Sequence, residues 1–273
     1  MQGEVERALG VLLARAGRDV TLSVAGRTDA GVHAWGQVAS YEGEPVAPRG
    51  LNALLPGDVA ALSCTVADDR FDARRDATSR AYCYRVLARP ARGVLDRGRA
   101  LHWPWQVDVA LLDACAAALA GTHDFTAFTP TDTEHVRLSR DVFAAFWLVS
   151  GHVLEFWIEA DAFMRNMNRV LVGTMLQVAR GRRSVDDFMS LLSGRPRSAA
   201  GPTAPPWGLY LAGAGYQGKH VVSPRSAASR RSEDRQPASR AAQARPCGDV
   251  ETSVRRLGRD RFDDDAGILE DRQ

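Results

Sequence analysis

A stretch near the amino terminus, Gly26 to Ala34, places a carboxylate close to a guanidinium on a loop bracketed by glycines. Gly26 and Gly31 permit backbone conformations that other residues avoid, and they let a ligand approach closely. Arg27 can keep Asp29 ionised by charge pairing, and an ionised, positioned carboxylate is a potential nucleophile. A structural loop in which the two charges only stabilise each other is an equally good interpretation of these residues alone.

Predicted helices and strands surround this loop and must position it. Apolar residues from Val5 to Ala16 recur at helical spacing, so an amphipathic helix is expected from near the first residue. Two alternating segments joined by Ser150-Gly151-His152 predict a hairpin of strands 140–149 and 153–160. Ser184 and Asp187 resemble a capping box before a short helix that ends at about 192. Further strands are expected at 20–25, 36–42, 59–66, 81–88 and 208–213, and further helices at 107–120 and 162–180. Antiparallel strands with interspersed helices indicate an α+β fold.

The composition is that of a globular protein, because 45% of the 273 residues are hydrophobic. No apolar run is long enough to span a bilayer, so we expect a cytoplasmic protein with no membrane partner. The four cysteines are scattered, which indicates neither a metal site nor a disulfide framework. The net charge of +2 does not by itself show nucleic-acid binding, which depends on local clusters of arginine.

The loop sequence Gly-Arg-Thr-Asp-Ala-Gly-Val-His-Ala, followed by Gly36-Gln37-Val38, resembles the active-site signature of the tRNA pseudouridine synthase A family. The resemblance extends to about residue 216. It is specific because many blocks follow in the order of the family. These blocks are residues 51–56, 71–74, 77–84, 121–125, 162–165 and 208–211.

The resemblance implies two similar α/β halves that share a central antiparallel sheet flanked by helices. We expect a catalytic half over 1–90 that carries the Asp loop, and a second half over 91–216 that carries an arginine-bearing helix. Residues 217–273 are rich in Arg, Ser and Ala, which predicts a disordered tail. Family members have a strand before the point where Met1-Gln2-Gly3-Glu4 begins, so we expect that strand to be missing through a misplaced start codon.

The activity implied by the resemblance is the isomerisation of uridine to pseudouridine in the anticodon stem-loop of tRNA, at positions 38, 39 and 40. The reaction is redox-neutral and needs no cofactor. Asp29 is then the nucleophile, and its attack at C6 of the base or at C1′ of the sugar stays open. Arg27 supports the charge of Asp29. Homodimers are also implied.

Two arginines of the predicted helix 162–180, Arg165 and Arg169, stand four residues apart. Like charges at this spacing repel each other unless an anion lies opposite, and Asp29 or an RNA phosphate would serve. By resemblance, Arg169 pairs with the catalytic Asp. Two residues depart from the family pattern: Asn166 replaces a common His, and Asn168 replaces a usual Val. A buried Asn168 without a partner would cost about 1 to 3 kcal/mol. Two arginines in a solvated stripe are the other interpretation.

Tyr82 corresponds by resemblance to the active-site tyrosine of the family. Its ring can stack on the target base, and its hydroxyl can assist removal of the C5 proton. The target uridine must be flipped out of the stem, so basic side chains are expected along the approach. We expect substrate contacts from Tyr82, Arg165, Arg80 and His33.

Two other classes of function stay open. A tRNA-binding protein of the same fold would keep the cleft but lack activity, because the first strand is missing. A hydrolase of N-glycosidic bonds would need a second carboxylate near Asp29, and none is near it in the sequence.

Overall fold

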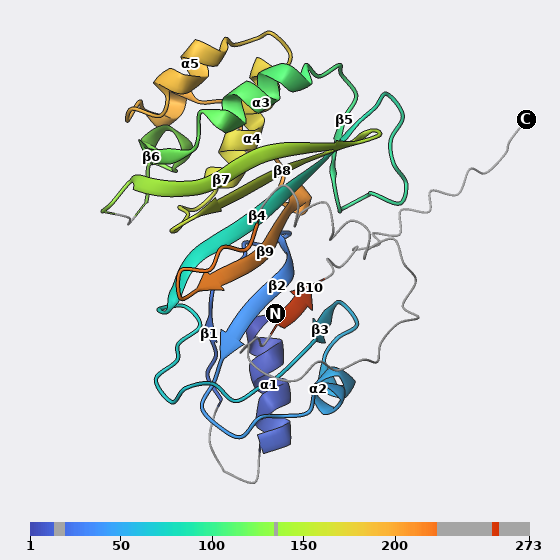
Figure 1. Ribbon diagram of the computed structural model, residues 1–273. Coiled ribbons are helices and arrows are strands. Elements are labelled where there is room, and N and C mark those ends of the chain that lie inside the picture. The colour runs from blue at the N-terminus through green and yellow to red at the C-terminus, as the bar shows by residue number, and fades with distance from the viewer. Residues whose placement is uncertain (14–19, 134–135, 223–252, 257–273) are drawn as a thin grey trace, which may run out of the picture.

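A computed structural model describes residues 1–13, 20–133, 136–222 and 253–256 of the chain (Figure 1). The described helices are α1 (Gln2–Leu13), α2 (Pro48–Leu54), α3 (Val109–Ala117), α4 (Met167–Val178) and α5 (Val185–Ser190). The described strands are β1 (Ser23–Val24), β2 (His33–Ser40), β3 (Val59–Ala61), β4 (Ala77–Ala88), β5 (Leu101–Trp103), β6 (Gly121–Asp124), β7 (Ser139–Ser150), β8 (Val153–Ala160), β9 (Leu209–Tyr216) and β10 (Ser253–Arg256).

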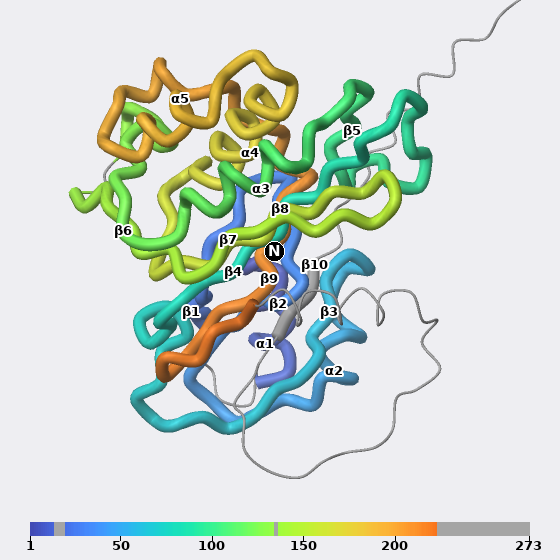
Figure 2. The backbone as a smooth tube through the Cα atoms, turned by 45° about the horizontal axis from the view of Figure 1, so that its top comes forward, coloured from blue at the N-terminus to red at the C-terminus, as the bar shows by residue number. Residues whose placement is uncertain are grey.

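One sheet runs through the described part of the chain in the order β3-β10-β2-β9-β4-β8-β7-β6, while β1 pairs with β2 and β5 pairs with β4. Figure 1 shows α3, α4 and α5 over the end of the sheet that holds β4, β8, β7 and β6, and α1 and α2 at the other end. The tube in Figure 2 shows the same division from a second direction. The α+β fold with a central, mostly antiparallel sheet is therefore confirmed.

Two hydrophobic clusters hold these helices on the sheet. The larger one lies between the sheet and helices α3, α4 and α5, and it includes Phe125, Phe156 and Leu171 with almost no exposed surface. The second contains Val5, Ala8 and Leu9 of α1, packed near Leu22 and Ala39. The apolar stripe predicted for the first helix is thus buried at its start, although Leu12 is 38% exposed.

The hairpin predicted around Gly151 is confirmed by β7 and β8, which pair from Val142↔Ala160 to Ser150↔Val153. Gly151 has a positive φ of 57°, as a tight turn requires. The N-terminal half of the predicted capping box is confirmed as well, because the Ser184 hydroxyl accepts a hydrogen bond from the backbone N–H of Asp187, whose carboxylate pairs with Arg183.

The long helix starts later than its predicted beginning at residue 162. Asn166 adopts the left-handed conformation, with φ at 64°, and the regular helix begins at Met167. A left-handed residue cannot continue a right-handed helix, so residues 162–166 form a separate entry segment.

Strand β9 lies between β2 and β4, parallel to the first and antiparallel to the second. The pairing of β4 with β5 is also parallel, so the sheet is mostly antiparallel and has two parallel pairs among the described strands. Strand β4 belongs to the predicted first half, yet it pairs with β8 and β9 of the second. The two predicted halves are therefore joined along one continuous sheet.

The predicted disordered tail, 217–273, falls mostly outside the described residues. Where it is described, the structure differs from the prediction. Residues 253–256 form β10 between β2 and β3, antiparallel to both. Val221 and Val222 donate backbone hydrogen bonds of 2.9 to 3.0 Å to the fully buried Glu159 carboxylate, which fixes the segment after β9.

Helix α4 packs closely against the segment 201–204. The backbone N–H of Gly201 donates to the Thr174 hydroxyl at 3.0 Å, and the backbone N–H of Ala204 donates to the Arg169 carbonyl at 3.0 Å. A Cβ on Gly173 would overlap the carbonyl oxygen of Pro202. The close approach therefore depends on glycine at this position of the helix.

We expect Gly173→Ala to lower the free energy of unfolding by about 2 to 3 kcal/mol, because the added methyl separates α4 from Pro202. Gly10→Ala is the matched control, since a Cβ at this helical position meets nothing within 4 Å. Its expected effect is a gain of up to about 1 kcal/mol from helix propensity. Urea unfolding of both variants checks the prediction, and equal changes in the two would contradict it.

Candidate active site

The loop that carries Asp29 leaves β1 after Val24 and enters β2 at His33. Its end is a tight turn in which the backbone N–H of Val32 donates to the Asp29 carbonyl at 3.0 Å. Gly31 has φ at +82°, and a Cβ there would lie 3.0 Å from Pro206, so both conformation and space require glycine. The side chain of Asp29 is exposed. The turn thus presents the carboxylate outward from a fixed backbone.

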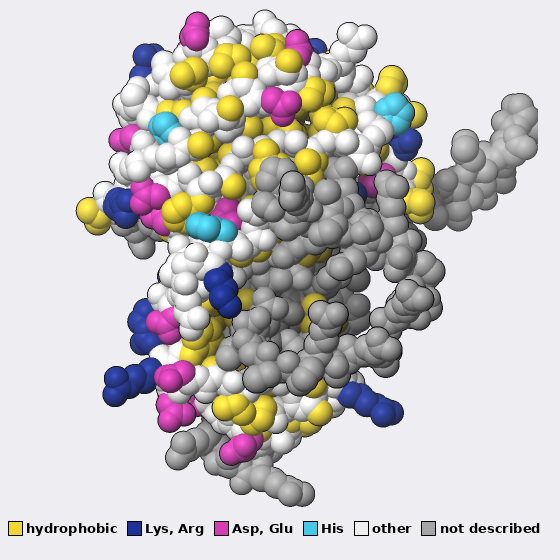
Figure 3. All heavy atoms as spheres, in the orientation of Figure 1, with side chains coloured by type: hydrophobic (Ala, Val, Ile, Leu, Met, Phe, Trp, Pro, Cys, Tyr) yellow, Lys and Arg dark blue, Asp and Glu magenta, His cyan; other side chains and the backbone are white. Residues whose placement is uncertain are grey.

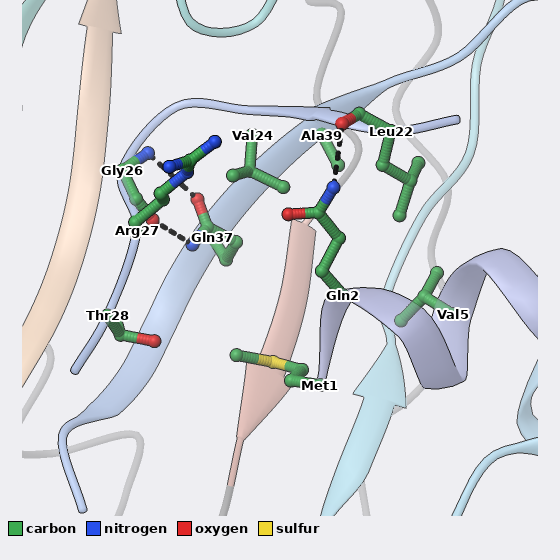
Figure 4. A pocket seen from close by; sticks show the side chains of 10 residues that line it. All are labelled: Met1, Gln2, Val5, Leu22, Val24, Gly26, Arg27, Thr28, Gln37 and Ala39. Atoms are coloured by element: carbon green, nitrogen blue, oxygen red, sulfur yellow. Dashed lines mark hydrogen bonds between the residues drawn. The ribbon is translucent and has the colours of Figure 1, made fainter. Parts of the chain in front are cut away.

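A cavity of about 270 Å³ lies beside the start of this loop. Gly26, Arg27 and Thr28 line one side, and Met1 with Gln2 at the start of α1 lines another (Figure 4). Arg27 is exposed, and Figure 4 shows its side chain next to Gly26 at the cavity wall. Gln2 closes the far side by donating to the Leu22 carbonyl at 3.1 Å.

Tyr82 on β4 lies next to the same loop from the opposite direction. A Cβ on Gly26 would stand 3.4 Å from the Tyr82 hydroxyl oxygen. Burial raises the pKa of Tyr82 to about 12, Arg80 opposes the rise, and the charge of Asp29 adds to it. The Tyr82 ring also meets Phe163 edge-on, with centroids 5.0 Å apart. The structure therefore brings together the Asp29 loop, β4 and the entry segment of α4.

Arg169 lies in the first turn of α4, near Tyr84, one position further along the same face of β4. Its Nε donates to the Ala204 carbonyl at 2.7 Å, and its Nη1 donates to Asn166 Oδ1 at 2.7 Å. Burial raises the pKa of Tyr84, and the Arg169 charge opposes that rise. Among the described ion pairs, none joins Arg169 to Asp29, so the expected pairing stays a prediction.

Arg80 donates hydrogen bonds to four backbone carbonyls and is half-buried. Its acceptors are Ala25, at 3.1 Å, and the carbonyls of Ala77, Asp161 and Arg74. These acceptors belong to the start of the Asp29 loop, the start of β4 and the segments before β4 and α4. The geometry makes Arg80 a connector of the segments around the site, and the expected contact with substrate stays a prediction.

The other two predicted contacts have different surroundings. Arg165 is exposed and forms an ion pair with exposed Asp132, an arrangement that contributes little to stability. His33 is only 3% exposed. Its ring stacks on Tyr210, with centroids 4.7 Å apart, and its Nε2 lies 2.9 Å from the Gly98 carbonyl oxygen. His33 thus has the position of a core residue, which gives no support to a contact with substrate.

Charges are mixed on the surface that Figure 3 presents. Blue arginine or lysine side chains alternate there with magenta carboxylates along the visible margin, without a continuous basic area. Within the described ranges, no group of three or more His, Cys, Asp or Glu residues could hold a metal ion. None of the helices described is both long and apolar enough to cross a membrane.

Comparison with known proteins identifies the family. The model of a family described as tRNA pseudouridine synthase matches residues 115–217. The tRNA pseudouridine synthase A of Chromobacterium violaceum is 38% identical over 235 residues, which cover 84% of this chain and 89% of that protein. The chain belongs to the tRNA pseudouridine synthase A family.

Other members of this family give similar values. The protein of Bacillus subtilis is 38% identical over 77% of this chain and 87% of its own length. The protein of Myxococcus xanthus is 40% identical over 77% of this chain and 81% of its own length. The chain is therefore a member of an isomerase family, and the resemblance seen in its sequence motifs is confirmed.

Sequence reasoning missed Gln37 as a residue of the site. Its amide accepts a hydrogen bond from the Gly26 N–H and donates one to the Gly26 carbonyl (Figure 4). The signal available in the sequence was its position in the family signature, directly after the loop. What the side chain does there depends on the register of β1 against β2, which sequence alone did not predict.

Asn168, the departure from the family noted above, is 4% exposed, and its Oδ1 has no hydrogen-bond donor among the described residues. We expect Asn168→Val to raise the free energy of unfolding by about 1 to 3 kcal/mol, because it removes the unpaired oxygen at similar helix propensity. Asn166→Val is a control with the opposite expected effect. It places a β-branched residue in the left-handed conformation and removes the side-chain oxygen that accepts a hydrogen bond from Arg169, so it should lower the free energy of unfolding. Chemical denaturation distinguishes the two, and a loss of stability in Asn168→Val would contradict the prediction.

The raised pKa of Tyr82 predicts a loss of stability in alkali. The folded state keeps the phenol proton to about pH 12, whereas the unfolded chain releases it near pH 10, so stability falls as pH rises between these values. The contribution of one such group to the slope is about 1.4 kcal/mol per pH unit. We expect Tyr82→Phe to flatten the decline by that amount in unfolding measurements from pH 9 to 11.5. Parallel curves for the two proteins would show that Tyr82 is not the group concerned.

Proposed function

We propose that this protein converts uridine to pseudouridine in tRNA, with Asp29 as the nucleophile. The observation that carries the proposal is the placement of Asp29. Its carboxylate is exposed on a loop that is fixed at both ends, and it lies close enough to Tyr82 to raise the pKa of that residue. Membership of the family supplies the reaction class, and the geometry supplies a carboxylate in a defined position.

The reaction exchanges one glycosidic bond for another. The bond between N1 and C1′ breaks, and a bond between C5 and C1′ forms. The proton on C5 leaves, and N1 of the product carries a proton, so no water or redox partner is consumed. Asp29 begins this sequence by attack at C6 or at C1′, and both routes need an ionised carboxylate.

The neighbouring side chains have distinct roles in this proposal. Tyr82 is protonated at neutral pH, so it contributes an aromatic face and a neutral hydroxyl next to the base. Arg27, at the cavity wall, and Arg169, at the start of α4, provide positive charge around the site. Arg165 contacts substrate from its exposed position. Arg80 holds the surrounding backbone in place.

The substrate proposed is the anticodon stem-loop of tRNA, at positions 38, 39 and 40, as the family resemblance implies. A uridine in a stem must leave the stack, which costs a few kcal/mol that phosphate contacts and stacking repay. We further propose that the protein acts in the cytoplasm as a homodimer, also from the resemblance.

The experiment is release of tritium from unmodified tRNA that carries [5-³H]uridine. We expect release by the wild-type chain and a loss on the order of 10³-fold or more in Asp29→Asn, because the nucleophile is removed while the shape is kept. Asp113→Asn is the matched control, since Asp113 is an exposed carboxylate on α3, and its activity should equal that of the wild type. The tRNA affinity of Asp29→Asn should stay within a few-fold of the wild-type value.

Other outcomes would overturn the proposal in different ways. Binding of tRNA without tritium release by the wild-type chain would indicate the inactive binding protein. Free uracil among the products would indicate a hydrolase of the N-glycosidic bond. Undiminished release by Asp29→Asn would exclude Asp29 as the nucleophile while leaving the reaction class intact.

A further inference from the structure

The register between β1 and β2 places Gln37 opposite Gly26. Ser23 pairs with Ser40 and Val24 with Ala39, so continuing the antiparallel register brings Gly26 to Gln37. Backbone hydrogen bonding between the two segments ends at Ala25, whose N–H donates to the Val38 carbonyl at 2.9 Å, and at Gly26 the Gln37 side chain provides the hydrogen bonds. Its Nε2 donates to the Gly26 carbonyl at 2.6 Å, and its Oε1 accepts from the Gly26 N–H at 3.3 Å. A side-chain amide thus substitutes for a neighbouring strand.

This substitution occurs where β2 exchanges one neighbour for another. Ala34 pairs with β9 on one edge and with β10 on the other. Val38 pairs with β10 while its carbonyl accepts the N–H of Ala25 at 2.9 Å, so β1 lies on the same edge as β9. Gly36 still lies against β9, because a Cβ there would be 2.6 Å from the Ala212 carbonyl oxygen, so the change of neighbour falls at Gln37. Figure 4 shows Gln37 reaching from β2 to Gly26 at this position.

The start of the loop is therefore held by side chains and backbone together. Ala25 is bonded by Val38 and by Arg80, and Gly26 is bonded twice by Gln37. Gln37 is 5% exposed, so water cannot readily replace its hydrogen bonds. Asp29 follows three residues later, and its own turn closes through Val32. The orientation of the Gly26 backbone, held through its N–H and its carbonyl, thus sets the direction of the chain from Gly26 to Asp29.

We propose that Gln37 is a positioning residue, which acts through Gly26 to hold the Asp29 carboxylate in its reactive place. This inference rests on the function proposed above. Among the described residues, the Gln37 amide is hydrogen-bonded to Gly26 and not to Asp29. Its removal should therefore lower the rate of the chemical step and leave tRNA binding nearly unchanged, because a displacement of about 1 Å in a reacting group can cost about 10²-fold in rate.

The substitution Gln37→Glu tests the role of the amide, because protonation of the introduced carboxyl group restores a hydrogen-bond donor. The introduced carboxylate can accept from the Gly26 N–H, but it cannot donate to the Gly26 carbonyl, so two oxygens face each other. Once protonated, the carboxyl regains a donor and reproduces the hydrogen bonds of the amide. Burial next to a carbonyl raises the pKa of such a carboxyl above its ordinary value. Activity should then return as the pH falls.

Other residues that carry a charged group lie near this position and are the same in every variant. Arg27 and Met1 line the same cavity as Gln37, Arg80 is bonded to the Ala25 carbonyl, and Glu6 of α1 accepts from the Leu22 N–H. Asp29 itself belongs to the same loop. The wild-type protein and Gln37→Leu carry all of these groups, so their pH profiles are the reference for the profile of Gln37→Glu.

The experiment measures kcat and KM for tritium release from tRNA between pH 5.5 and 8.5, together with the melting temperature. At pH 8 we expect Gln37→Leu and Gln37→Glu to lose roughly 10- to 100-fold in kcat with KM within about twofold. Relative to wild type, Gln37→Glu should recover towards pH 5.5, whereas the loss in Gln37→Leu should not change with pH. Gln106→Glu, at an exposed site, is the control and should match the wild type.

A Gln37→Leu protein with the wild-type kcat would overturn the inference, as would a loss confined to KM or a Gln37→Glu deficit that is constant with pH. If Gln37→Leu fails to fold, the ratio of the Gln37→Glu kcat to the wild-type kcat at two pH values still decides. Wild-type activity with these outcomes would refute only the role of Gln37. Absence of tritium release by the wild type would refute the proposed function, and this inference with it.

Discussion

The insertion of β9 between β2 and β4 is the constraint on which the rest of the structure depends. It requires backbone to approach backbone and ring more closely than any side chain permits. A Cβ on Gly36 would lie 2.6 Å from the Ala212 carbonyl oxygen, and one on Gly208 would lie 2.6 Å from the ring of Tyr84. Because these positions are glycine, the strand that follows the Asp29 loop and the strand that carries Tyr82 stay in one sheet.

Hydrogen bonds to backbone carbonyls then turn this proximity into a defined site. Arg80 connects Ala25 to Asp161, and Arg169 connects the start of α4 to Ala204. The Tyr84 hydroxyl donates to the neighbouring Pro205 carbonyl at 2.8 Å, and Pro206 lies against Gly31. Four segments far apart in the sequence are thus linked through main-chain acceptors. In this arrangement the arginines organise the backbone around Asp29, and only some of their N–H donors are used to do so.

The sequence predicted the elements whose signals are local. The β7–β8 hairpin, the cap at Ser184 and the buried face of α1 follow from turn residues, capping chemistry and apolar spacing. Strands β5 and β6 and helix α2 were not predicted, because such short segments owe their structure to the partners they meet. The same holds for β10, which has no strong apolar pattern and becomes a strand only between β2 and β3. The late start of α4 depends on one left-handed residue, Asn166, which no periodicity reveals.

The sequence predicted which residue types form the site, but it predicted fewer of the contacts that these residues make. The family motifs located Asp29 and Tyr82, and the structure brings these two residues together. The same structure buries His33 against Tyr210, and the Arg80 side chain donates its hydrogen bonds to backbone carbonyls. The role of Gln37 is the clearest case of information absent from a linear pattern. The contact between Gln37 and Gly26 depends on strand register. Residues 26 and 37 lie opposite each other because Val24 pairs with Ala39. A loop that must leave a sheet to reach a substrate loses its ladder of hydrogen bonds, and disorder would follow if nothing replaced them. The Gln37 amide provides hydrogen bonds to Gly26, one residue beyond the last backbone hydrogen bond at Ala25. The loop therefore leaves the sheet while its start stays bonded to β2.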